Sequence, residues 1–112
     1  MLHPGEAPRV PYVTRAFADT QGPIVAASDY LKVLPDLIDR WLPRPLVSLG
    51  TDGFGRSENR ASLRNHFEVD SRFVTVATLA ALARDKQIDT KVVQQAIRDL
   101  EIDPEKVNPA TA

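Results

Sequence analysis

Two short apolar runs are the only parts of this sequence with the pattern of buried strands, and they limit the folds open to it. The runs are Ile24–Ala27 and Leu46–Leu49, with an amphipathic segment between them. Strands that alternate with helices indicate a parallel sheet of the α/β class. Two strands leave both edges of such a sheet unpaired. We therefore expect an incomplete α/β sheet, with neighbouring parallel strands, that continues in another segment or another chain.

Helices are expected on both sides of the first strand. Residues 12–18 fit two helical turns, and residues 31–42 carry apolar side chains at spacings of three and four. Pro35 lies inside the second of these segments and cannot donate a backbone hydrogen bond. We expect it to kink or tighten the first turn of that helix without abolishing the helix.

The second half of the chain is predicted to be helical. Helices are expected at residues 58–67, capped by Ser57, and at residues 71–84, capped by Asp70, with a further helix capped by Asp89. The middle helix has almost no polar face, so it should be buried on most sides.

Composition limits the domain count and the chemistry. The chain has 112 residues, a net charge of −1 and no cysteine, which disfavours nucleic-acid binding and excludes disulfides and thiolate catalysis. With no apolar run long enough to span a bilayer, a cytoplasmic location is the default. We expect an extended, proline-rich lead-in with a short helix at 1–23, a partial α/β domain at 24–102 and an irregular tail at 103–112.

A glycine-rich loop at residues 50–57 follows the second strand. Three glycines fall within six positions, a pattern that favours a tight turn. The loop is either a structural turn, with Phe54 filling the core or an interface, or an anion site. It matches neither a Walker loop nor the GxGxxG pattern.

Charged residues around the loop give no catalytic set. Arg56, Arg60 and Arg64 recur every four residues. Three interpretations are open: a solvated stripe, partners for acidic groups across a subunit interface, or a phosphate site. His66 is expected at a surface or interface, and a solvated face is the expected place of Asp36 and Asp39. The candidate loop and interface residues are Asp29, Asp52, Phe54, Arg56, Ser57, Arg60, Arg64 and His66.

Longer strings of residues carry a resemblance. The strings are residues 1–4, 8–12, 27–30, 50–57, 63–64, 66–70, 102–103 and 106–109. Together they resemble the C-terminal domain of transketolase-like, thiamine diphosphate-dependent enzymes, and most of all the homodimeric, decarboxylating first component of the pyruvate dehydrogenase complex. The fold class that follows is part of a three-layer α/β domain with short parallel strands and a helix-rich C-terminal half.

The resemblance implies a function for a larger parent enzyme. Such an enzyme binds thiamine diphosphate and Mg²⁺, decarboxylates pyruvate and passes the acetyl group to the lipoyl acyltransferase component. In the family a Gly-Asp-Gly motif with a later asparagine holds the cofactor; here Thr51 stands in the place of the first glycine, before Asp52. The chain is therefore expected to carry no catalytic, cofactor-binding or metal-binding residue.

Two hypotheses for the chain itself follow. It is a structural and dimer-supporting piece of the parent enzyme, with the rest of that enzyme and its dimer mate as partners. Alternatively, it is a stand-alone interaction or regulatory ligand-binding module derived from the same domain. In the first case the isolated chain should expose apolar surface and should dimerise, bind a complementary fragment or be marginally stable.

Overall fold

A computed structural model describes residues 1–53 and 59–111 of the chain. Six helices and two strands are assigned in these residues, one of the helices being a 3₁₀ turn. Their bounds are α1 Tyr12–Phe17, β1 Ile24–Ala27, α2 Val33–Asp36, the 3₁₀ helix η1 Asp39–Trp41, β2 Leu46–Leu49, α3 Arg60–His66, α4 Ser71–Arg84 and α5 Thr90–Asp99.

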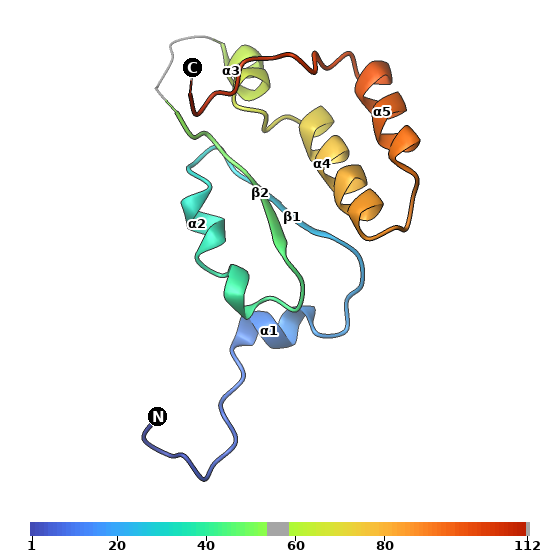
Figure 1. Ribbon diagram of the computed structural model, residues 1–112. Coiled ribbons are helices and arrows are strands. Elements are labelled where there is room, and N and C mark those ends of the chain that lie inside the picture. The colour runs from blue at the N-terminus through green and yellow to red at the C-terminus, as the bar shows by residue number, and fades with distance from the viewer. Residues whose placement is uncertain (54–58, 112) are drawn as a thin grey trace.

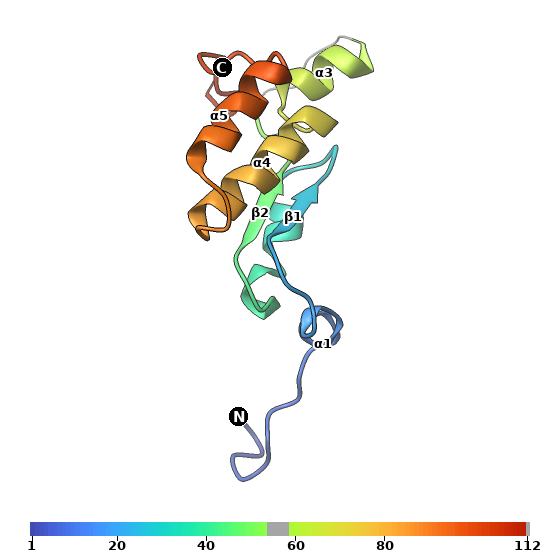
Figure 2. The same ribbon diagram turned by 90° about the vertical axis from the view of Figure 1, so that its right-hand side faces the viewer.

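The two strands form a parallel pair, as the sequence predicted. Ile24 lies opposite Leu46 and Ala27 opposite Leu49. The pair is the middle of three layers: α2 covers one face, α4 covers the other, and α5 packs outside α4 (Figures 1 and 2). The fold is therefore a small α/β arrangement, and both outer edges of its sheet lack a strand among the described residues.

The segment between the strands differs from the single helix expected over residues 31–42. It divides into α2 and η1, and Pro35 lies inside α2 rather than ending it. The division comes after Leu37, where Asp39 turns towards the sheet and accepts a 2.8 Å hydrogen bond from the Leu46 amide. The prediction of one continuous helix was therefore wrong because a side-chain contact to β2 competes with the helical turn.

Asp36 also binds the sheet, through a hydrogen bond from the hydroxyl of Ser48. Asp36 and Asp39 are both exposed, as their spacing predicted, and they also bind β2. Both bonds fix the α2–η1 segment on the sheet, with its apolar side chains turned elsewhere.

The later helices begin at side-chain caps. Asp70 accepts hydrogen bonds from the amides of Arg72 and Phe73, and Asp89 accepts one from Lys91. Both caps were predicted. The cap of α3 is Asn59, whose side chain accepts from the Ser62 amide, so the prediction of a helix capped at Ser57 was wrong.

The same helices end in a shared backbone motif. One residue in the left-handed region follows each of them: Glu68 (φ 61°), Lys86 (φ 59°) and Glu101 (φ 55°). The next amide in each case reaches back to a carbonyl in the last helical turn, as Val69 does to Arg64. These are Schellman motifs, a position that glycine usually fills.

The core is thin for a chain of this length. Phe67, Val69 and Ala81 are the buried apolar side chains among the described residues. In α4 only Ala81 is buried, so the expectation that α4 would be covered on most sides was wrong. Among the described residues, α4 packs mainly on the sheet and on α5 (Figure 2), and its Arg72 also reaches Asn65 in α3.

Global dimensions agree with a thin core. The Cα radius of gyration is 17.1 Å, against about 13 Å for a compact chain of this length. The accessible surface is 8446 Å², against about 6,100 Å² for a compact protein of this mass. The N-terminal arm, which extends away from the layers, contributes part of the difference (Figure 1). None of the described helices is long and apolar enough to cross a membrane.

Candidate functional site

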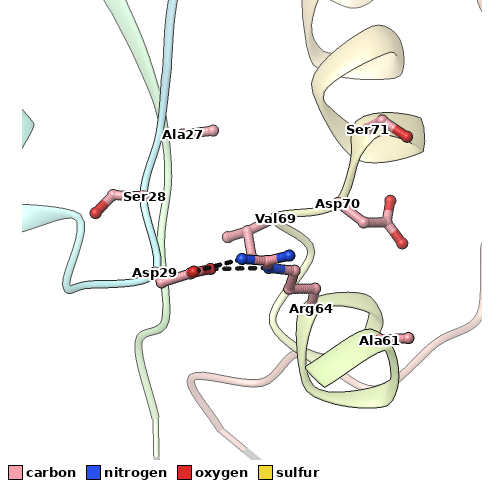
Figure 3. A pocket seen from close by; sticks show the side chains of 8 residues that line it. All are labelled: Ala27, Ser28, Asp29, Ala61, Arg64, Val69, Asp70 and Ser71. Atoms are coloured by element: carbon pink, nitrogen blue, oxygen red, sulfur yellow. Dashed lines mark hydrogen bonds and ion pairs between the residues drawn. The ribbon is translucent and has the colours of Figure 1, made fainter. Parts of the chain in front are cut away.

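A cleft opens where the carboxyl end of β1 faces α3 and the start of α4 (Figure 3). Its volume is about 570 Å³. The carboxyl edge of a parallel sheet is where α/β proteins bind ligands. Side chains from three segments line the cleft: Ala27, Ser28, Asp29, Ala61, Arg64, Val69, Asp70 and Ser71.

An ion pair crosses this cleft. Arg64 donates from Nη2 to Oδ2 of Asp29 at 2.8 Å and from Nε to Oδ1 at 3.3 Å, which is the two-point geometry that arginine and carboxylate groups favour. The side chains are 41% and 63% exposed. The pair joins the end of β1 to α3, two segments 35 residues apart in the sequence.

The pair shifts the titration of its own members. The hydrogen bond from Arg64 lowers the pKa of Asp29, while partial desolvation opposes that shift and the charges of Arg64 and Arg60 add to it. The hydrogen bond to Asp29 raises the pKa of Arg64. Arg64 therefore has an acidic partner within the chain, and of the predicted stripe of arginines Arg60 adds its charge to the same carboxylate.

Asp52, whose neighbours resemble the family's cofactor motif, forms a hydrogen bond within the chain instead. Its Oδ1 accepts a 3.0 Å hydrogen bond from the Lys32 amide, at the start of α2. Its neighbour Thr51 donates from its hydroxyl to the carbonyl of Asp29 at 3.1 Å. These contacts tie the end of β2 to the end of β1, and no group of three or more metal-ligating side chains occurs in residues 1–53 and 59–111.

Two glycines let the strand ends and the tail approach closely. A Cβ on Gly50 would lie 2.6 Å from the carbonyl oxygen of Tyr30. Gly53 has a φ of +114°, and a Cβ there would lie 2.1 Å from the carbonyl oxygen of Pro109. The described part of the glycine loop is therefore a packed structural turn; the predicted residues Phe54, Arg56 and Ser57 lie outside the described residues.

The C-terminal tail supplies contacts that the sequence did not indicate. Lys106 donates from Nζ to the His66 carbonyl at 2.5 Å and lies 3.6 Å from a carboxylate oxygen of Glu68. A cation at this position favours the carbonyl end of α3. The His66 ring stacks edge-on against Phe67, with centroids 4.8 Å apart. A single lysine in an irregular tail gives no signal of this contact.

The described residues of the cleft position chain segments, and none of them pairs a nucleophile with an adjacent base. Asp29 and Arg64 bind each other, and Asp70 caps α4 while also accepting from the Arg72 side chain. The hydroxyl of Ser28 accepts a hydrogen bond from the Tyr30 amide. The charged groups of the cleft are thus engaged within the chain.

Comparison with known proteins places this geometry in a family. Residues 6–70 match the model of the transketolase-like TK C-terminal domain. The pyruvate dehydrogenase E1 component of Escherichia coli K12 is 49% identical over 113 aligned residues, which cover 100% of this chain and 12% of that protein. The corresponding component of Pseudomonas aeruginosa is 48% identical over 96% of the chain, and that of Mycobacterium tuberculosis is 43% identical over 92%. The chain thus spans about 12% of the length of these relatives.

Proposed function

The chain belongs to the transketolase-like TK C-terminal domain family, and from that premise we propose that it works as part of a pyruvate dehydrogenase E1 component. In that enzyme pyruvate is decarboxylated with thiamine diphosphate and the acetyl group passes to the lipoyl acyltransferase component. The observation that carries the proposal is 49% identity to one such component along the whole of this chain.

The residues described do not fit thiamine diphosphate and Mg²⁺. The Asp52 carboxylate binds the Lys32 amide, and no cluster of three or more metal ligands lies in the described residues. The cofactor would therefore be held by the rest of the enzyme. The carbanion chemistry belongs to the cofactor, and this chain contributes structure.

A structural, dimer-supporting role agrees with the thin core. The accessible surface exceeds that of a compact protein of this mass by roughly 2,000 Å². Within residues 1–53 and 59–111 each edge of the sheet is unpaired, which adds backbone groups able to bond a further strand. We propose that the remainder of the enzyme and its homodimer mate cover this surface. The cytoplasmic location and the domain bounds at residues 24–102 stay predictions.

An exchange of segments tests the proposal. The matched segment of the E. coli K12 component is replaced by this chain, and the chimera is compared with the intact enzyme and with a version lacking the segment. We expect a dimeric chimera that decarboxylates pyruvate within about tenfold of the intact enzyme, while the deletion loses activity. A folded chimera no more active than the deletion would refute the proposed function.

One observation favours a second candidate, a regulatory ligand site. The cleft of about 570 Å³ lies at the carboxyl edge of the sheet and contains Arg64, which stays 41% exposed while it pairs with Asp29, so an anion would compete with that carboxylate. Inorganic phosphate is the probe for an anion site there. A saturable rise in the melting temperature that is lost in Arg64→Gln would support this candidate, and an unchanged melting temperature would remove it.

A further inference from the structure

We propose that an apolar face on α2 and η1 is the surface through which this region docks on the preceding part of the same E1 polypeptide. The inference rests on the proposed function and adds the place of contact. We define the α2–η1 face as the exposed large apolar side chains of residues 31–41, of which Ile38 also lines the cavity next to β1. They are Leu31, Val33, Leu34, Leu37, Ile38 and Trp41.

Much of the area of these side chains is exposed to solvent. Leu37 is 66% exposed, and Val33 and Leu34 are 55% and 54% exposed. Together the six present roughly 600 Å² of mostly apolar surface, at the upper end of the largest patch on a typical monomer. The largest apolar patch on a monomer is often functional.

The polar groups of the same segment explain why the face is so apolar. Asp36 and Asp39 are drawn to β2 by hydrogen bonds to Ser48 and Leu46. Basic residues lie near the two ends of the face. Lys32 lies at the start of the segment, and the Arg40 guanidinium lies 4.5 Å from the centre of the Trp41 ring. The occupant should be apolar in its middle and acidic where it meets Lys32 and Arg40.

That charge pattern argues against a second copy of this chain. Two copies related by a two-fold axis would pair their segments either antiparallel or parallel. In the first case Lys32 of one copy approaches Arg40 of the other, and in the second each basic residue approaches its own counterpart. Like charges so placed disfavour association. The face also offers less than the roughly 800 Å² per partner of a standard interface.

A larger and chemically different occupant fits both points. The relatives are E1 components of which this chain spans about 12%, so most of such a polypeptide lies outside this region. Because both surfaces then belong to one polypeptide, docking needs less area than a stable complex of separate chains, and the rest of the polypeptide can supply the acidic residues. In Figure 1, α2 lies on one face of the sheet, while α4 and α5 lie on the other.

The experiment compares amide hydrogen exchange of residues 31–41 in the isolated chain and in the full-length chimera. We expect at least tenfold slower exchange in the chimera. Leu37→Glu should lower the melting temperature of the chimera, leave the isolated chain unchanged, and expose residues 31–41 again. Val107→Glu is the matched control, because Val107 is 63% exposed and lies outside the face; it should leave exchange at residues 31–41 unaltered.

Each other outcome separates the two proposals. An active, dimeric chimera with unprotected residues 31–41 would overturn the docking site and leave the proposed function standing. Equal effects of Leu37→Glu and Val107→Glu would also overturn it. Light scattering that finds the isolated chain dimeric, and monomeric after Leu37→Glu, would assign the face to a second copy instead. An inactive, unassembled chimera would refute the proposed function together with the docking site that rests on it.

Discussion

Four glycines of this chain differ in whether an added methyl group would strain the backbone, crowd its neighbours, or do both or neither. Gly5 has open space and an ordinary φ, and Gly22 has open space but a φ of +87°. Gly50 has an ordinary φ but no space, since a Cβ would meet the Tyr30 carbonyl oxygen at 2.6 Å and the Lys32 amide at 2.8 Å. Gly53 has both problems. Alanine at each position therefore measures backbone strain, crowding, both or neither.

The structure sets the expected order. Gly5→Ala should be neutral or slightly stabilising, because alanine restricts the unfolded chain. Gly22→Ala should cost about 1 kcal/mol of unfolding free energy, the usual cost of a left-handed alanine. Gly50→Ala should cost about 2–3 kcal/mol, because both atoms that it meets are backbone atoms and cannot rotate away. Gly53→Ala should be the most destabilising of the four.

Urea unfolding of the chain, followed by far-ultraviolet circular dichroism, measures these costs. With a slope near 1.5 kcal/mol per molar, Gly50→Ala should lower the midpoint by roughly 1–2 M and Gly22→Ala by less than 1 M. The assay needs a cooperative transition in the unsubstituted chain. If Gly50→Ala proved as mild as Gly5→Ala, the close approach of β2 to Tyr30 would be wrong, and with it the account of the strand ends.

Three further predictions concern single side chains. The hydrogen bond from Arg64 lowers the pKa of Asp29 below its ordinary value of 3.8, so the ion pair stabilises the fold above that pH and stops doing so as the pH falls through the lowered value. Asp29→Asn should therefore remove the acid-sensitive part of a profile of melting temperature against pH. An unchanged profile would contradict the pairing. Asp70→Ala removes the cap of α4 and should cost about 1–2 kcal/mol in urea unfolding, with Ser71→Ala, at the first position of the helix, as a near-neutral control. Lys106→Met keeps the aliphatic part of the side chain but loses the contacts to the His66 carbonyl and to Glu68. Amide hydrogen exchange at the end of α3 should therefore become faster, while exchange in α5 stays the same. An equal change in both helices would refute a local role for Lys106.

Local sequence rules accounted for the elements whose signals lie within a few residues. The strands Ile24–Ala27 and Leu46–Leu49 were predicted from short apolar runs, and the cap of α4 from Asp70, which binds amides two and three residues ahead. The parallel pairing of the two strands was predicted from the order strand, helix, strand along the chain. Each of these signals survives because nothing distant competes with it.

Contacts between distant residues were beyond such rules. The division between α2 and η1 depends on a bond from Leu46 to Asp39, seven residues earlier. The pair of Asp29 and Arg64 spans 35 residues, and Lys106 reaches back 40 residues to His66. No periodicity marks partners so far apart. The family resemblance added the larger context, which the residues alone did not indicate.

The left-handed residues that end α3, α4 and α5 leave room for engineering. A non-glycine residue in that conformation costs about 1 kcal/mol relative to glycine, so Lys86 and Glu101 each hold back stability that a one-residue change would release. At Glu68 the cost is partly returned, because the strained residue presents its carboxylate to Lys106. Glycine at Lys86 and at Glu101 should therefore stabilise the chain, at two helix ends that lie outside both the cleft and the α2–η1 face.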